Sequence, residues 1–192
     1  LLARAGAHEV DWLGTSMGGI LGMLMASMPG SPIKRLIIND VGPFLPKSAL
    51  ERIASYTGNA PDCDYIGVLE AYLREVHAPF GDLTDQQWRH MAEASSREVD
   101  EGKVALAYDP AIGDNFRAGP LGDVDMWGEW DAIRCPTLVL RGESSDLLLS
   151  EHAEEMTRRG PKAELAEITG CGHAPALMDP EQIALIRDWL AK

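Results

Sequence analysis

The chain has 192 residues with 30 acidic and 17 basic side chains, which gives a net charge of −13 at pH 7. This length suits one domain, or one domain with an insertion. No run approaches twenty uninterrupted apolar residues, so the sequence excludes a membrane-spanning helix. The acidic pI near 4.7 argues against nucleic acid and anionic membrane surfaces as partners, because both require a basic face.

The three cysteines, Cys63, Cys135 and Cys171, are too few and too scattered for a disulfide framework or a Cys-x-x-Cys metal pair. They favour a reducing compartment, so we expect a cytoplasmic protein. The first residue is Leu1, and residues 1–7 read like the last turns of a helix. We therefore expect the chain to begin partway through a domain, with any targeting segment upstream of it.

Short apolar runs with the length and the bounding residues of strands occur in both halves of the chain. They are Val10–Gly14, Arg35–Asp40, Thr137–Gly142 and Ala163–Ile168. The second and third are almost continuously apolar, as parallel strands covered on both faces are.

Helical segments lie between and after these strands. Ile20–Met28 is apolar on nearly every side, which predicts a fully buried helix. Ser150–Arg159 ends in two arginines before a Gly-Pro pair, a typical helix stop. The last helix has Asp179 as its N-cap and Pro180 at its first position. Alternation of strand and helix predicts an α/β fold with a parallel sheet.

The stretch from Pro43 to Trp130 differs from its flanks. It holds amphipathic helical patterns but no convincing strand, and it carries 16 acidic against 7 basic side chains. It also holds most of the chain's aromatic residues. We interpret residues 43–130 as a helical cap inserted into a core formed by 1–42 and 131–192, covering a site as a lid.

The strongest local signal is Gly14-Thr15-Ser16-Met17-Gly18-Gly19. A Gly-x-Ser-x-Gly pattern is weak alone, but here a strand ends at Gly14 and a helix follows Ser16, the setting of a nucleophile elbow. Such a turn is sharp, and we expect a Cβ at Gly14 or Gly18 to collide with neighbouring backbone. The alternative is a glycine-rich turn in which Ser16 is a plain N-cap.

A serine nucleophile needs a base, and His173 in Gly-Cys-Gly-His is the best candidate among five histidines. It lies in a short loop between the fourth strand and the last helix, where catalytic side chains collect. The alternative is a loop histidine with a structural role.

The base in turn needs an anion that holds its tautomer. Asp146 follows the third strand and Asp40 ends the second, so both project toward the same rim of a parallel sheet. We expect Asp146 to be the acid, because the order Ser, Asp, His then matches the hydrolase arrangement, with Asp40 as the alternative and Glu143 as a third candidate.

These motifs, in this order and with a helical insertion between them, resemble the α/β-hydrolase superfamily, and within it the lidded serine esterases and carbon–carbon bond hydrolases. The resemblance spans essentially the whole chain. It implies Ser16 as nucleophile, His173 as base, Asp146 as acid and the Met17 N–H as one oxyanion donor. The chain departs from the family in lacking the early strands and the His-Gly-x-x-Gly loop, so its four strands correspond to the C-terminal half of the sheet. That departure leaves a bare apolar edge beside Val10–Gly14 and puts the second oxyanion donor in doubt.

We expect acyl transfer to water on a small, neutral, partly hydrophobic carboxylic ester. Cleavage of a carbon–carbon bond or of an N-terminal proline amide by the same triad is an alternative, and a non-catalytic or truncated protein of this fold is another. Cys171 and His173 have no second ligand pair at usable spacing, so we expect neither a metal nor an organic cofactor. The sequence does not indicate an oligomeric state.

Overall fold

The computed structural model describes residues 2–59, 61–99 and 102–192, and the chain divides into two units. The first runs up to Pro46 and resumes at Asp123, and the second is Lys47–Gly122. Both boundaries lie a few residues inside the insertion of 43–130 that the sequence suggested. The chain therefore leaves the first unit once and returns to it once.

Four parallel strands form the sheet of the first unit, in the order β1-β2-β7-β8. They are β1 Val10–Thr15, β2 Ile33–Asn39, β7 Thr137–Gly142 and β8 Glu164–Ile168. Each overlaps one of the predicted strands, with its ends shifted by at most two residues. The predicted α/β fold with a parallel sheet is confirmed.

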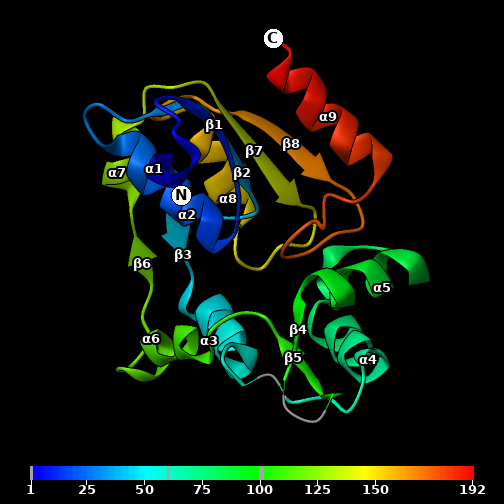
Figure 1. The fold of residues 1–192 in the computed structure, drawn as a ribbon. Coiled ribbons are helices and arrows are strands. Elements are labelled where there is room, and N and C mark those ends of the chain that lie inside the picture. The colour runs from blue at the N-terminus through cyan, green and yellow to red at the C-terminus, as the bar shows by residue number, and fades with distance from the viewer. Residues whose placement is uncertain (1, 60, 100–101) are drawn as a thin grey trace. The chain divides into compact units, whose positions relative to one another are not determined.

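Helices lie on both sides of the sheet (Figure 1). Alternate residues of β2 contact different helices. Leu36 and Ile38 approach glycines of α2 (Met17–Ser27), whereas Ile37 packs in a cluster with Trp189 of α9 (Pro180–Leu190). Leu36, Ile37 and Ile38 are all buried, because a central strand is covered on both faces. The continuous apolar run that identified this strand in the sequence has this cause.

The prediction that the helix after Ser16 is fully buried is wrong. Met17, Leu21 and Leu24 and the C-cap residue Met28 follow one another at intervals of about one turn, and between 37% and 62% of each is exposed. Only the opposite face, which contains Gly19, Gly22 and Met23, packs into the core. A helix that is apolar all round presents no periodicity from which the buried face could be read.

The outer edge of β1 has no paired strand among the described residues, as expected from the sequence. Leu13 on this strand is 43% exposed. It lines a groove with Leu177 and with Ile183, Ile186 and Leu190 of α9.

The remaining elements of the first unit are short except for α9. They are α1 Leu2–Ala5, the antiparallel pair β3 Phe44–Leu45 and β6 Val124–Asp125, α7 Trp127–Ala132 and α8 Ser150–Met156. Helix α9 begins as predicted, with the Asp179 carboxylate accepting from the Glu181 N–H. Glu164 of β8 accepts hydrogen bonds from Lys192 and Trp189, which hold the pKa of this carboxyl below its ordinary value.

The second unit is largely helical. Its elements are α3 Lys47–Tyr56, α4 Ile66–Val76, a 3₁₀ turn Ala78–Phe80, α5 Asp85–Ala94, β4 Ser96–Glu98, β5 Val104–Leu106, a 3₁₀ turn Pro110–Gly113 and α6 Asp114–Arg117. Leu69 and Leu73 of α4 pack against Trp88 and Ala92 of α5 in its core. The expectation that residues 43–130 contain no strand is wrong, because β3, β4, β5 and β6 all lie in this stretch. Strands of two or three residues are too short to show an alternating pattern.

No helix in the described ranges 2–59, 61–99 and 102–192 is both long enough and apolar enough to cross a bilayer.

Candidate active site

The register of the parallel sheet brings three distant segments to one rim. Thr15 pairs with Asn39, and Asn39 pairs with Leu140, so β1, β2 and β7 end side by side. The Ser16 N–H donates to the Asn39 carbonyl, and the Asp40 N–H donates to the Leu140 carbonyl. Carboxyl ends of parallel strands are where sites form in α/β folds.

Ser16 occupies a strained turn between β1 and α2. Its φ of 50° and ψ of −116° are rare for a residue with a side chain. It stands in the N-cap position, but its side chain makes no capping hydrogen bond, which argues against the plain N-cap alternative. The strained backbone instead directs the hydroxyl elsewhere, to the imidazole described below.

Two glycines allow this turn, but they are not the pair that the sequence suggested. A Cβ on Gly14 would lie 2.1 Å from the Gly18 carbonyl oxygen, as expected. A Cβ on Gly18 would meet nothing within 4 Å, so the prediction for Gly18 is wrong. Gly19 is the second constrained position, because its Cβ would lie 2.6 Å from the Val41 side chain.

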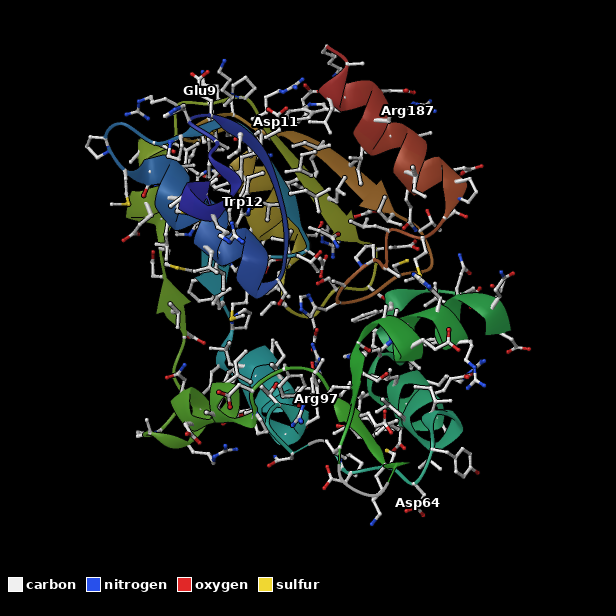
Figure 2. The ribbon with its side chains drawn as sticks, in the orientation of Figure 1. Glu9, Asp11, Trp12, Asp64, Arg97 and Arg187 are labelled. Carbon is white, nitrogen blue, oxygen red and sulfur yellow. The ribbon has the colours of Figure 1, made fainter. Side chains whose placement is uncertain are left out.

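Trp12 braces the turn from β1 (Figure 2). Its indole N–H donates to the Gly18 carbonyl at 2.9 Å. Its ring also packs against α2 so closely that a Cβ on Gly22 would lie 2.6 Å from the ring atoms. One side chain therefore fixes the first turns of α2 against the strand that carries Ser16.

We expect Gly14→Ala to destabilise the fold by about 3 kcal/mol or more, because the colliding atom belongs to the backbone and cannot move aside. Gly18→Ala is the matched control, with open space around its new methyl group, and should change the free energy of unfolding by at most about 1 kcal/mol. Urea denaturation followed by circular dichroism measures both. Equal losses in the two variants would contradict this account of the turn.

The imidazole of His173 links Ser16 to Asp40. His173 Nε2 lies 3.0 Å from Ser16 Oγ, and His173 Nδ1 lies 2.8 Å from Asp40 Oδ2. Asp40 is fully buried and His173 is 7% exposed, whereas Ser16 is half-buried and accessible from solvent. This is the geometric order of nucleophile, base and acid in a catalytic triad.

The hydrogen-bond partners also fix the tautomer of the histidine. An ionised carboxylate only accepts, so Nδ1 must carry the proton that is shared with Asp40. Nε2 then presents its lone pair to the Ser16 hydroxyl. The ring is thus set to take a proton from Ser16 rather than to give one.

Asp146, the expected acid, is not the partner of His173 Nδ1, and this prediction is wrong. The structure places the alternative, Asp40, in that position. Asp40 directly follows a central strand and is covered on all sides, whereas Asp146 lies four residues beyond the end of β7 and is exposed. Glu143, the third candidate, accepts from the Gly170 N–H at 3.0 Å and so contacts the loop before His173.

Three residues near the site were missed from the sequence. The Gly142 N–H donates to Asp40 Oδ1 at 2.7 Å, and the Ser145 hydroxyl donates to Asp40 Oδ2 at 2.6 Å. The Asn39 amide donates to the Pro175 carbonyl at 2.9 Å, two residues beyond His173. The only sequence signal was their position at strand ends, where Asn39 precedes Asp40 and Gly142 closes β7.

The start of α2 supplies a donor beside the nucleophile. Met17 is the first residue of this helix, so its N–H has no acceptor within the helix. The resemblance to the α/β hydrolases implies this N–H as one oxyanion donor, and the Met17 N–H lies next to Ser16 in the chain. Among the described residues, no group of three or more histidine, cysteine, aspartate and glutamate side chains is arranged to hold a metal ion.

Known proteins share both the sequence and the fold. The model of the alpha/beta hydrolase family matches residues 1–184. A 3-hydroxybutyrate-oligomer hydrolase from Cupriavidus necator is 42% identical over an alignment of 193 positions, gaps included, that covers 96% of this chain and 66% of that protein. The chain therefore spans about two thirds of the length of this relative.

Solved structures agree. An α/β hydrolase from Novosphingobium aromaticivorans is 36% identical with a TM-score of 0.86, over 99% of this chain and 68% of that one. A protein from Rickettsia typhi is 33% identical with a TM-score of 0.90, over 99% and 65%. With the family model matching nearly its whole length, and with the parallel sheet and the Ser16 turn in place, the chain belongs to the alpha/beta hydrolase family.

Proposed function

We propose that this chain carries the catalytic groups of a serine hydrolase that cleaves carboxylic esters by acyl transfer to water. Ser16 is the nucleophile, His173 the base and Asp40 the acid. The observation that carries the proposal is the continuous chain of contacts from Ser16 Oγ through the His173 ring to buried Asp40, at 3.0 Å and 2.8 Å. The similarity to a relative that hydrolyses 3-hydroxybutyrate oligomers supports an ester as substrate, because a hydroxy acid joined head to tail forms esters.

In the first half of the reaction, Ser16 Oγ attacks the ester carbonyl carbon while its proton moves to His173 Nε2. The carbonyl oxygen becomes negative, and the Met17 N–H donates to it. The bond to the alcohol oxygen then breaks, and His173 returns the proton to that oxygen. The products of this half are a free alcohol and an acyl group on Ser16.

In the second half, His173 Nε2 takes a proton from water as the water oxygen attacks the acyl carbon. The bond to Ser16 Oγ breaks, and the proton passes from His173 to Ser16. Ester and water have become acid and alcohol, and the enzyme is restored. In both halves Asp40 stabilises the imidazolium and holds the ring orientation.

The helical unit of residues 47–122 is acidic and rich in aromatic residues, and we propose it as the cap that selects the substrate. Apolar side chains suit a neutral, partly hydrophobic ester. An excess of carboxylates disfavours the approach of anions.

A substrate panel tests the proposed reaction. We expect hydrolysis of p-nitrophenyl acetate and butyrate and of a 3-hydroxybutyrate dimer capped as its methyl ester. The chain should leave a vinylogous 1,3-diketone and a proline p-nitroanilide unchanged. Absence of turnover on every ester would contradict the proposal. Turnover of only the diketone would assign the same triad to carbon–carbon cleavage, and turnover of only the anilide would assign it to amide cleavage.

A further inference from the structure

The Ser145 hydroxyl forms hydrogen bonds in three directions although its side chain is short. It donates to Asp40 Oδ2 at 2.6 Å and accepts from the backbone N–H groups of Leu147 and Leu148 at 3.3 Å and 3.1 Å. Only 5% of Ser145 is exposed. Its hydrogen-bonding capacity is therefore filled by groups of the protein.

The direction of each bond follows from chemistry. An ionised carboxylate can only accept a hydrogen bond and a backbone N–H can only donate one. The direction of each bond to the Ser145 hydroxyl is therefore fixed. The Ser145 O–H must therefore point at Asp40. Two N–H dipoles on its oxygen polarise this bond and make the hydroxyl a stronger donor.

Asp40 Oδ2 thus receives two hydrogen bonds, one from Ser145 and one from His173. Asp40 Oδ1 receives the Gly142 N–H, so β7 and the turn after it hold both oxygens of the carboxylate. From these contacts we infer that Ser145 is a positioning residue of the triad. It sets the orientation of Asp40 and the share of the carboxylate charge that is available to His173, and this role rests on the triad proposed above.

The turn containing Ser145 is itself anchored beside the histidine loop. The Ser144 N–H donates to the Cys171 carbonyl, and a Cβ on Gly142 would lie 2.2 Å from the Gly172 carbonyl oxygen. Arg141 donates to the Leu148 carbonyl at 2.9 Å. The turn that carries the donor to Asp40 and the loop that carries His173 are therefore in direct contact.

A purely structural role for Ser145 makes a different prediction. As an acceptor for two N–H groups, the hydroxyl would only stabilise the turn between β7 and α8, and its loss would lower the stability without altering the titration of the site. As a donor to Asp40, it also withdraws negative charge from the oxygen that faces His173. Its removal leaves more charge on that oxygen and favours the protonated imidazole.

Substitution of Ser145 by threonine and by valine separates the two roles. Threonine and valine have nearly the same shape, but valine has a methyl group where threonine has the hydroxyl. We expect Ser145→Thr to keep near-normal kcat/KM on the best ester of the panel. Ser145→Val should lower it by about tenfold, the scale of one lost hydrogen bond to a charged group. The acidic limb of its pH profile should also move to higher pH, because His173 must lose its proton to act and now retains it longer.

Ser144→Ala is the matched control in the same turn. The Ser144 hydroxyl donates to the Cys171 carbonyl at 3.1 Å and not to Asp40, so its loss should leave the limb in place. The other ionisable groups on these loops stay constant in every variant. They are Arg141 with its partner Glu167, Glu143 against Gly170, exposed Asp146 and buried Cys171.

A second measurement needs no substrate. We expect the proton that His173 Nδ1 shares with Asp40 to give a far-downfield proton resonance. This resonance should shift in Ser145→Val and stay unchanged in Ser145→Thr and Ser144→Ala. If the valine variant does not unfold cooperatively, Ser145→Ala takes its place in both measurements. If the acidic limb of the pH profile and the resonance are the same with and without the Ser145 hydroxyl, the role of Ser145 is overturned. If the wild type hydrolyses none of the esters, the proposed reaction is overturned, and the resonance still tests the role of Ser145.

Discussion

Asp40→Asn is expected to lower kcat for ester hydrolysis by about 10⁴-fold, the scale seen when a triad acid becomes an amide. Asparagine has nearly the shape of aspartate, but when its oxygen accepts from the Gly142 N–H, its NH₂ group takes the place of Oδ2 and faces His173 Nδ1 as a donor. The tautomer with the proton on Nε2 is favoured, and that nitrogen no longer accepts the Ser16 proton. Steady-state kinetics on p-nitrophenyl butyrate measures the loss.

Asp146→Asn is the matched comparison, since it makes the same chemical change on the same rim in an exposed residue. We expect its kcat to stay within about threefold of the wild type, as for a surface substitution away from the reacting groups. Cooperative thermal unfolding of both variants excludes misfolding as the cause. A large loss in Asp146→Asn with little loss in Asp40→Asn would show that the arrangement around His173 is not the catalytic one.

Ser16→Ala is expected to remove covalent labelling by a fluorophosphonate probe and to lower ester turnover by at least about 10⁴-fold. The probe reacts with a serine oxygen only when a neighbouring base takes its proton, and His173 Nε2 lies 3.0 Å from Ser16 Oγ. In-gel fluorescence and intact-mass spectrometry detect the adduct. Wild-type chain should take up one label.

Ser144→Ala provides the control for labelling, because Ser144 is exposed near the same rim but bonds to a carbonyl rather than to a histidine. It should label as the wild type does. Persistent labelling of Ser16→Ala would mean that another serine is the nucleophile. A wild-type chain that folds cooperatively and stays unlabelled would favour a non-catalytic member of the family.

Local sequence patterns were sufficient to predict those features in which the functional residue and the secondary-structure signal lie within a few residues of each other. Gly14 and Ser16 lie within one turn, so their spacing reported a strand-to-helix elbow directly. The continuous apolar runs around Ile37 and Val139 predicted central strands, because both faces of such a strand are covered. His173 was singled out by a short glycine-flanked loop after a strand.

The choice between Asp40 and Asp146 could not be made in this way. Both follow a parallel strand, so both are expected on the same rim. The expectation of Asp146 rested on the order Ser, Asp, His along the chain, an order that Asp40 satisfies as well. What separates them is burial and the direction of a side chain, and neither quantity has a periodic signature. Ser145 was missed for the same reason, because a hydrogen bond between residues 105 positions apart leaves no local pattern.

The sequence by itself therefore predicted the strands of the parallel sheet and two of the three side chains that meet at its rim, because strand periodicity, turn chemistry and a nucleophile motif are local properties of the chain. The tertiary structure decided which carboxylate meets the histidine, which face of α2 is buried and which glycines are constrained. These depend on the strand order β1-β2-β7-β8 and on atoms brought together from distant segments, so they exist only once the sheet is assembled.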